Sequence, residues 1–443
     1  MNRPTFLLSM TLMGLGWGLL SLGAQTGYEP KPADPYFEKF NLRRAPEPGP
    51  LLLKTGDRLA IVGDSITEQK LYSRLIETYL TVCVPDLKVT ARQYGWSGET
   101  AAGFLKRMDQ DCLRFQPTVA TFCYGMNDAK YRPYDDLNGE WYRDNYTALV
   151  RAFKAAGARV VLGSPGISSK LASWVKTKSG TLDELNLNLG ALRDIGIGIA
   201  QREEVRFADI FWPMFKAEVE GRKRYGESDG RPYSLAGKDG VHPGWAGQLV
   251  MAYAFLRAMG LDGDLGTVSV DMSAGKATAV AGHTVDAFAN QVVRLTSVRY
   301  PFCATGETNL DASLRSGMTL IPFNAQLNRF MLILTGGTAA QYRVTWGAKT
   351  MTYETTRLAK GVNLAEDFEE NPFSGAFKKV DEAVAAKQAY ETKQIKQVIH
   401  NAKGKADVDA AVARTEAERA PLVEAIRAAF VPVKHEIKIA PVP

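Results

Sequence analysis

Histidine and cysteine are scarce in this sequence, with four of each in 443 residues. The four cysteines are Cys83, Cys112, Cys123 and Cys303. Neither residue type forms a cluster with the spacing of a metal site, so we expect no metal and no other cofactor. Cys83 and Cys112 could pair in an oxidising compartment, although their spacing alone does not establish a bond. Cys123 lies in an apolar run, which favours a buried free thiol.

A large excess of one charge is also absent. The formal net charge of +6 is small for this length, and both signs are mixed along the chain, so nothing indicates a nucleic-acid partner. Phosphate-binding, zinc-protease and dinucleotide-binding patterns are missing. The absence of these patterns favours a reaction that side chains carry out without a bound metal ion or nucleotide.

Long apolar runs are missing outside the N-terminus. Residues 1–24 contain one charge, Arg3, then an apolar stretch and a small residue, which is typical of a signal peptide. An uncleaved anchor is the alternative. We expect a secreted or periplasmic protein with no membrane span after cleavage. Residues 25–50 are rich in proline and predict an extended leader that lies on the domain or tethers it.

The remaining sequence divides into three segments. Residues 51–262 alternate strand-like and helical patterns, which predicts a three-layer α/β/α domain with a flavodoxin-like parallel sheet of five strands. Residues 263–373 alternate apolar and polar positions between glycine-rich turns, which predicts a smaller antiparallel β-rich domain. Residues 374–443 predict a helical hairpin followed by a terminal strand that could pair back into the β-rich domain. The oligomeric state cannot be read from these patterns.

One serine stands where a predicted strand passes into a helix. Ser65, at the end of "LAIVGDS", could be a helix cap or a nucleophile. A serine nucleophile needs an imidazole to take its proton, and the imidazole needs an acceptor on its other nitrogen. Of the four histidines, His242 lies in a loop of the α/β segment, "GKDGVHPGWAG", three residues after Asp239. Any surface loop can hold such a pair, so further residues must decide.

Two other strand ends offer donors for an oxyanion hole. Gly98 follows the second predicted strand, where its N–H can face a ligand, and Asn127 follows the third with a side-chain amide. Either could be an ordinary turn residue. However, the carboxyl ends of the strands in a doubly wound sheet border one crevice, so these residues are expected to lie near Ser65.

Taken together, the motifs resemble those of the SGNH (GDSL-type) serine hydrolases. They are Gly63-Asp64-Ser65, Gly98 in "SGET", Asn127 in "GMND", and Asp239 and His242 in "DGVH", in the family's order. The resemblance implies a nucleophilic Ser65, with His242 as base and Asp239 as its orienting acid. It also implies an oxyanion hole formed by the N–H groups of Ser65 and Gly98 and the amide of Asn127. An isoleucine and a threonine follow the serine where the family name expects leucine.

We therefore expect an exported serine esterase that cleaves acyl esters, acetyl or other short chains, on a small molecule or a carbohydrate. The loop at 164–180 is long and polar, and its Trp174 and Lys170 could face a sugar. Two alternatives remain open. An acyltransferase would use the same triad and pass the acyl group to a sugar, and a non-catalytic carbohydrate-binding protein could be built on the same fold.

Overall fold

The structure is a computed structural model that describes residues 27–176 and 179–443. The predicted signal peptide at 1–24 lies outside the described residues. Among the described helices, none has both the length and the apolar character needed to cross a membrane.

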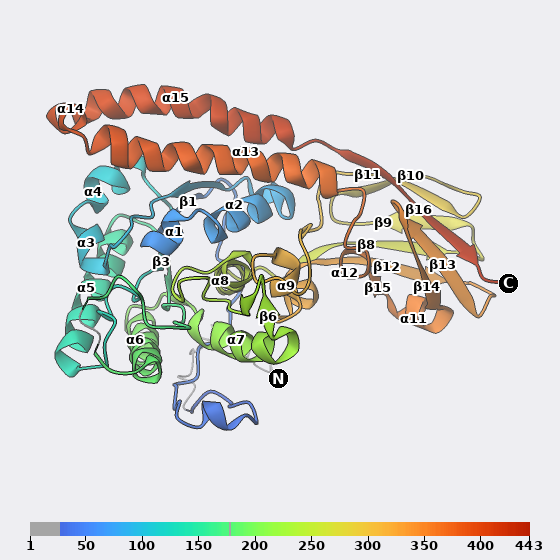
Figure 1. The fold of residues 1–443 in the computed structure, drawn as a ribbon. Coiled ribbons are helices and arrows are strands. Elements are labelled where there is room, and N and C mark those ends of the chain that lie inside the picture. The colour runs from blue at the N-terminus through green and yellow to red at the C-terminus, as the bar shows by residue number, and fades with distance from the viewer. Residues whose placement is uncertain (1–26, 177–178) are drawn as a thin grey trace, which may run out of the picture.

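The first half of the chain forms the predicted parallel sheet (Figure 1). Its strand order is β2-β1-β3-β4-β5, the flavodoxin-like order, and every pair of neighbours is parallel. The strands are β1 (Arg58–Gly63), β2 (Thr90–Gln93), β3 (Val119–Cys123), β4 (Arg159–Gly163) and β5 (Arg206–Ala208). All five residues of β3 are buried, as expected for a central strand covered on both faces.

Helices cover both faces of this sheet. They are α1 (Ser65–Glu68), α2 (Tyr72–Val82), α3 (Ala101–Leu105), α4 (Met108–Asp111), α5 (Asp136–Ala155), α6 (Leu182–Arg202), α7 (Phe211–Tyr225) and α8 (Trp245–Ala258). The connection from β1 leads to β2 on one side of it, and the later strands follow on the other side. Because the crossovers are right-handed, α2 lies on one face of the sheet, and α5 and α6 lie on the opposite face. Helix α8 packs against α2, and α3 packs against α5. The three-layer α/β/α fold is confirmed.

The proline-rich leader is packed onto the domain. Phe37 and Phe40 are buried against Trp212 and Phe215 of α7, with ring centroids 4.6–6.3 Å apart. The fully buried Arg193 of α6 binds Glu29 at 2.7 Å. These contacts fix the leader to α6 and α7, on a side of the domain that the sequence did not specify.

The four cysteines are free and buried. Cys83 and Cys112 do not form a disulfide, whereas Cys123 is the buried thiol that its apolar run predicts. Burial raises the pKa of the Cys83 and Cys123 thiols far above the ordinary value, so neither is a reactive thiolate.

The β-rich segment forms two sheets that face each other beside the α/β domain (Figure 1). One has the order β10-β11-β16-β13-β14 and the other β15-β12-β8-β9. The strands are β8 (Asp264–Asp271), β9 (Lys276–Ala279), β10 (His283–Ala289), β11 (Val292–Ser297), β12 (Arg329–Thr335), β13 (Gln341–Trp346), β14 (Lys349–Glu354), β15 (Val362–Asn363) and β16 (Val433–Pro441). Phe330 of one sheet packs on Trp346 of the other, with centroids 5.6 Å apart. The β-rich fold is confirmed.

One pair of strands departs from the antiparallel prediction. Strands β8 and β12 are parallel. A parallel pair needs a long connection, and here it includes residues 298–328, which cross onto the α/β domain. This connection carries α9 (Leu314–Met318) and α10 (Phe323–Leu327). Helix α9 lies so close to α8 that a Cβ on Gly317 would approach the Ala246 carbonyl to 2.8 Å.

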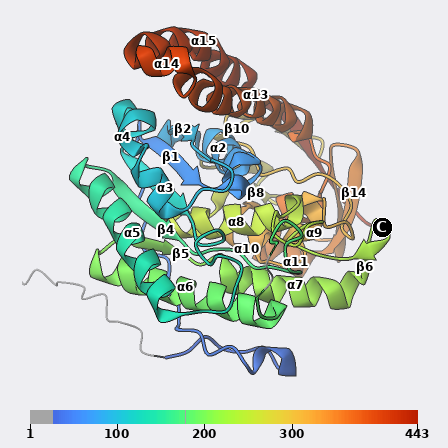
Figure 2. The same cartoon turned by 60° about the vertical axis from the view of Figure 1, so that its left-hand side comes forward.

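The C-terminal helices form the predicted hairpin. Helix α13 (Ser374–Lys393) continues into a π-helical turn (Gln394–Ile399), and α14 (Ala402–Ala406) and α15 (Val408–Ala429) return. Figures 1 and 2 show the hairpin extending from the β-rich region back over α2 and β2. Lys387 of α13 is buried between Glu77 of α2 and Glu391, at 2.9 and 2.8 Å. Short helices α11 (Thr355–Lys360) and α12 (Leu364–Asp367) complete the β-rich region.

A line of hydrogen bonds runs through the β-rich core. His283 Nε2 lies 2.7 Å from the Leu265 carbonyl and so donates to it, which leaves Nδ1 to accept from the Ser297 hydroxyl at 2.7 Å. Ser297 Oγ then accepts from His435 Nε2 at 2.9 Å, and His435 Nδ1 accepts from Trp346 Nε1 at 3.1 Å. Every group is satisfied only when both imidazoles are neutral.

Acid should therefore destabilise this region. Burial and the neighbouring His283 lower the pKa of His435 to about 3, and burial lowers that of His283 as well. The unfolded chain takes up these protons near the ordinary imidazole value of about 6.5, so stability is lost as the pH falls from there toward 3. We expect a loss of about 1.4 kcal/mol per pH unit from His435 alone. Denaturant titrations at pH 5.5 and 4.5 test this, and equal unfolding free energies would contradict it.

Candidate active site

Ser65 follows the carboxyl end of β1 and is the first residue of α1. The cap of this short helix is Asp64, whose side chain accepts from the Ile66 N–H at 2.9 Å. A Cβ on Gly63 would lie 2.2 Å from Thr67 Oγ1 and 2.8 Å from the Cys123 carbonyl, so the turn has room only for glycine. The capping function thus belongs to Asp64, and the Ser65 hydroxyl is left to another partner.

That partner is His242, in the loop before α8. His242 Nε2 lies 2.8 Å from Ser65 Oγ, and His242 Nδ1 lies 2.7 Å from Asp239 Oδ2. The other Asp239 oxygen accepts from the N–H groups of Val241 and His242 at 2.9 Å each. The structure therefore brings the three predicted residues into one hydrogen-bonded chain.

The electrostatics of Asp239 favour a carboxylate. Partial burial alone would raise its pKa, but the N–H groups of His242 and Val241 and the His242 ring outweigh burial and lower it. An ionised Asp239 accepts from His242 Nδ1–H, which leaves Nε2 free to accept a proton from Ser65. This is the tautomer that a general base requires.

Gly98 and Asn127 come from the loops after β2 and β3. Gly98 is exposed, with φ +75 and no atom within 4 Å of an added Cβ, so it is favoured here by its backbone conformation rather than by lack of space. The Tyr131 hydroxyl donates to Asn127 Oδ1 at 3.1 Å and fixes the amide orientation. Asn127 Nδ2 lies 3.0 Å from the Glu99 carbonyl and 3.5 Å from Asp64 Oδ2, beside the residue that precedes Ser65.

Two residues that the sequence analysis did not identify hold the Gly98 loop. Glu68, at the end of α1, accepts from the Ser97 N–H at 2.5 Å and binds Lys396 of the π-helical turn at 2.7 Å. The Lys396 ammonium also lies 5.0 Å from the centroid of the Trp96 ring. The C-terminal hairpin therefore contacts the loop next to Gly98.

The loop that carries His242 is held from the other side. Asp311, in the connection between β11 and β12, forms a bidentate ion pair with Arg231 and accepts from the Ser234 N–H at 3.0 Å. The Asp311 carbonyl also accepts from the Ala246 N–H at 3.2 Å. Nothing in the local sequence around Asp311 marks it as a partner of this loop.

Aromatic residues lie next to His242. Trp174 is 46% exposed, and its ring lies 5.5 Å from that of His242 and 6.0 Å from that of Tyr131. This places Trp174 where the sequence analysis expected it, at the site. Lys170 does not face the site in the same way, because its ammonium binds the Lys238 carbonyl.

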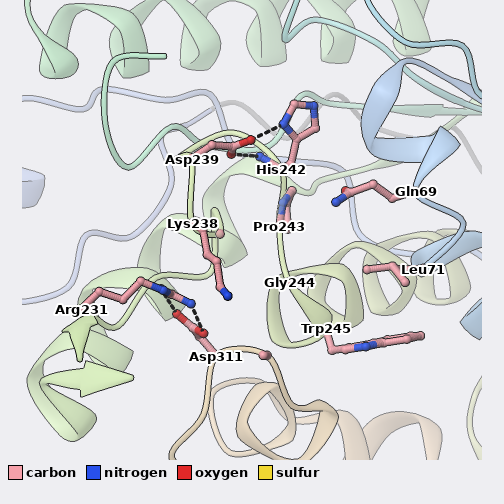
Figure 3. Close-up of a pocket in the computed structure, with 12 residues that line it drawn as sticks. Gln69, Leu71, Arg231, Lys238, Asp239, His242, Pro243, Gly244, Trp245 and Asp311 are labelled. Atoms are coloured by element: carbon pink, nitrogen blue, oxygen red, sulfur yellow. Dashed lines mark hydrogen bonds and ion pairs between the residues drawn. The ribbon is translucent and has the colours of Figure 1, made fainter. Parts of the chain in front are cut away.

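A pocket of about 320 Å³ adjoins His242 and Asp239 (Figure 3). It lies between the His242 loop, the turn after α1, and the connection that carries Asp311. Its lining residues are Gln69, Leu71, Arg231, Gly237, Lys238, Asp239, His242, Pro243, Gly244, Trp245, Asp311 and Ala312. Within the described residues, no group of three or more histidine, cysteine or acidic side chains could hold a metal ion.

Comparisons with known proteins bear on the domain that carries this site. Residues 61–250 match the model of the GDSL-like lipase/acylhydrolase family. The chain thus carries a GDSL-like lipase/acylhydrolase domain and is an ester-hydrolysing enzyme. No curated protein matches the sequence.

Solved structures are similar to this one. One is BT4096, described as a gut microbial diltiazem-metabolizing enzyme, with 22% identity and a TM-score of 0.68. The match covers 89% of this chain and all of that one, so the fold extends over the β-rich region and the hairpin. Another is Axe2, an acetylxylan esterase from Geobacillus stearothermophilus, with 20% identity and a TM-score of 0.38. That match covers 48% of this chain and 97% of the other.

Proposed function

We propose that this protein is an exported serine esterase that removes short acyl groups, acetyl among them, from carbohydrate alcohols. The observation that carries the proposal is the chain of hydrogen bonds from Ser65 through His242 to Asp239, at 2.8 and 2.7 Å. These are the contacts that an activated serine nucleophile requires.

The reaction follows from this geometry. His242 Nε2 takes the proton as Ser65 Oγ attacks the ester carbonyl, and ionised Asp239 stabilises the imidazolium that forms. His242 then gives the proton to the departing alcohol, which leaves the acyl group on Ser65. Water then loses a proton to the same nitrogen and attacks the acyl carbon. His242 returns this proton to Ser65 Oγ as the acid leaves, so both half-reactions use one base.

The negative charge that develops on the carbonyl oxygen needs donors. In our proposal these are the N–H groups of Ser65 and Gly98 and the Asn127 amide hydrogen that makes the longer contact, 3.5 Å to Asp64 Oδ2. Tyr131 supports this role of Asn127, because its hydroxyl occupies Oδ1 and turns Nδ2 toward Asp64 and Glu99.

Replacement of Asn127 by alanine should lower kcat by about 10²-fold with little change in KM, as removal of one oxyanion donor does. The amide acts on charge that exists mainly in the transition state, so ground-state binding is spared. Steady-state kinetics on 4-nitrophenyl acetate measure both constants. An effect confined to KM would assign Asn127 to substrate binding instead.

Two features support the carbohydrate and export parts of the proposal. An exposed indole such as Trp174, 5.5 Å from His242, offers a flat apolar surface of the kind that sugar rings stack on. Export rests on the charge and apolar pattern of residues 1–24. Cell fractionation of the full-length protein tests the second point, and retention in the cytoplasm would contradict it.

The decisive experiment labels the purified mature protein with a fluorophosphonate and maps the modified residue. We expect modification of Ser65 and unchanged activity in the presence of a chelator. Hydrolysis should be faster for 4-nitrophenyl acetate than for the decanoate. A protein that stays unlabelled would be a binding protein on this fold. Activity lost to the chelator and restored by a divalent cation would overturn the serine mechanism.

A further inference from the structure

The pocket beside the triad has a definite place in the proposed reaction. His242 and Asp239 line it, whereas the proposed oxyanion donors Gly98 and Asn127 do not. The acyl carbon must lie between Ser65 and the oxyanion donors, and the departing oxygen must lie near His242. A group in this pocket is therefore on the alcohol side of the ester. This step rests on the proposed function.

Side-chain acceptors in the pocket wall are already used. Both oxygens of Asp311 accept from Arg231, and they also accept from the Ser228 hydroxyl and the Ser234 N–H. Both oxygens of Asp239 are occupied by the His242 loop. Gln69 Oε1 accepts from Gln248 at 2.8 Å. Each carboxylate oxygen of the wall therefore already accepts at least one hydrogen bond.

Two donors remain. Figure 3 shows the Lys238 ammonium and the Gln69 amide nitrogen directed into the pocket. Neither group has an acceptor among the residues that the structure describes. Leu71, Pro243 and the half-buried Trp245 add apolar surface between them. A pocket with spare donors, one of them charged, favours a ligand that brings a negatively charged acceptor.

We propose that this pocket binds the alcohol part of the substrate and that this alcohol carries a carboxylate, as in an acidic sugar. The carboxylate accepts from Lys238 and Gln69, while the ring lies against Trp245 and Leu71. A volume of about 320 Å³ is at the small end of ligand pockets, which suits one sugar unit. The connection between β11 and β12 completes the wall, so this specificity depends on the region beyond the hydrolase domain.

The test compares methyl glucuronide with methyl glucoside. The first has a carboxylate at the carbon where the second has a hydroxymethyl group. Calorimetry on the Ser65→Ala protein measures binding without turnover. We expect methyl glucuronide to bind at least tenfold more tightly than methyl glucoside. Lys238→Met should abolish this difference, and Lys238→Arg should retain part of it. The matched control is Lys276→Met, which changes an exposed lysine on β9 and should keep the full difference in affinity.

Salt should weaken the preference, because it screens a charge pair at a pocket open to solvent. Equal affinity for the two sugars, no binding of either, or a preference that survives Lys238→Met would each overturn the proposal. Its failure is separable from failure of the proposed function. A wild-type protein that is inactive but still prefers the acidic sugar would contradict only the esterase mechanism. An active protein without this preference would contradict only the proposed role of the pocket.

Discussion

Replacement of Ser65 by alanine should lower kcat for ester hydrolysis by about 10³-fold or more. The hydroxyl is the proposed attacking group, and alanine leaves His242 with no side-chain hydroxyl to activate. Folding should be unaffected, because Asp64 rather than Ser65 caps α1. Kinetics on 4-nitrophenyl acetate, together with a melting curve, measure both effects.

Ser97→Ala is the matched control. Ser97 is exposed on the adjoining loop, and the contact it makes to Glu68 uses the backbone N–H, which alanine keeps. This variant should retain wild-type kcat. If Ser65→Ala kept more than a tenth of the wild-type kcat, Ser65 would not be the nucleophile. A large loss in Ser97→Ala would show that kcat is sensitive to any change in this loop.

The central sheet was predictable from the sequence because each of its strands can be identified from its own run of residues. An apolar run such as that of β3 is buried on both faces, and alternation with helices requires parallel pairing. The candidate site was predictable for the same reason. Ser65, Gly98 and Asn127 each follow a strand directly, and parallel topology brings the carboxyl ends of neighbouring strands to one edge.

The contacts that hold the site could not be predicted in this way. Glu68 and Lys396 are 328 positions apart, and Arg231 and Asp311 are 80 apart. A lysine in a helical pattern looks the same whether it faces solvent or an acid from another segment. Such pairs depend on how the hairpin and the connection after β11 dock, and the docking is fixed by packing between elements rather than by local propensity.

The parallel pairing of β8 with β12 escaped prediction for a related reason. The alternating pattern of a strand identifies its buried face but not its neighbours. Residues 298–328 contain short helices that pack against α8, and this excursion brings the chain back in the direction of β8. The alternating pattern of the surrounding sequence had placed residues 298–328 in the β-rich segment.

Deletion of residues 432–443 should cost more than loss of an edge strand. The terminal strand β16 pairs with β11 on one side and β13 on the other, so it is the centre of its five-stranded sheet. The prediction that the tail pairs back into the β-rich region is confirmed. Deletion removes the ladders on both sides and exposes the edges of β11 and β13.

The side chains that would be lost are also core residues. Val433, His435, Ile437 and Ile439 are buried, and the residues between them are exposed. Burial of one large aliphatic side chain contributes about 1.5–3 kcal/mol, so two isoleucines and a valine approach the total stability of many domains. We expect the truncated protein to be insoluble or to lose the thermal transition of the β-rich region.

A pair of substitutions separates the core contribution from strand pairing. Ile437→Asp places a charge in the buried face of β16 and should lower the melting temperature by about 10 °C or more, because the carboxylate has no partner there. Lys438→Asp changes the neighbouring exposed position of the same strand and should shift the melting temperature by only a few degrees. Differential scanning calorimetry of both variants and of the truncation decides the matter. If all three melted like the wild type, β16 would be dispensable for the sheet.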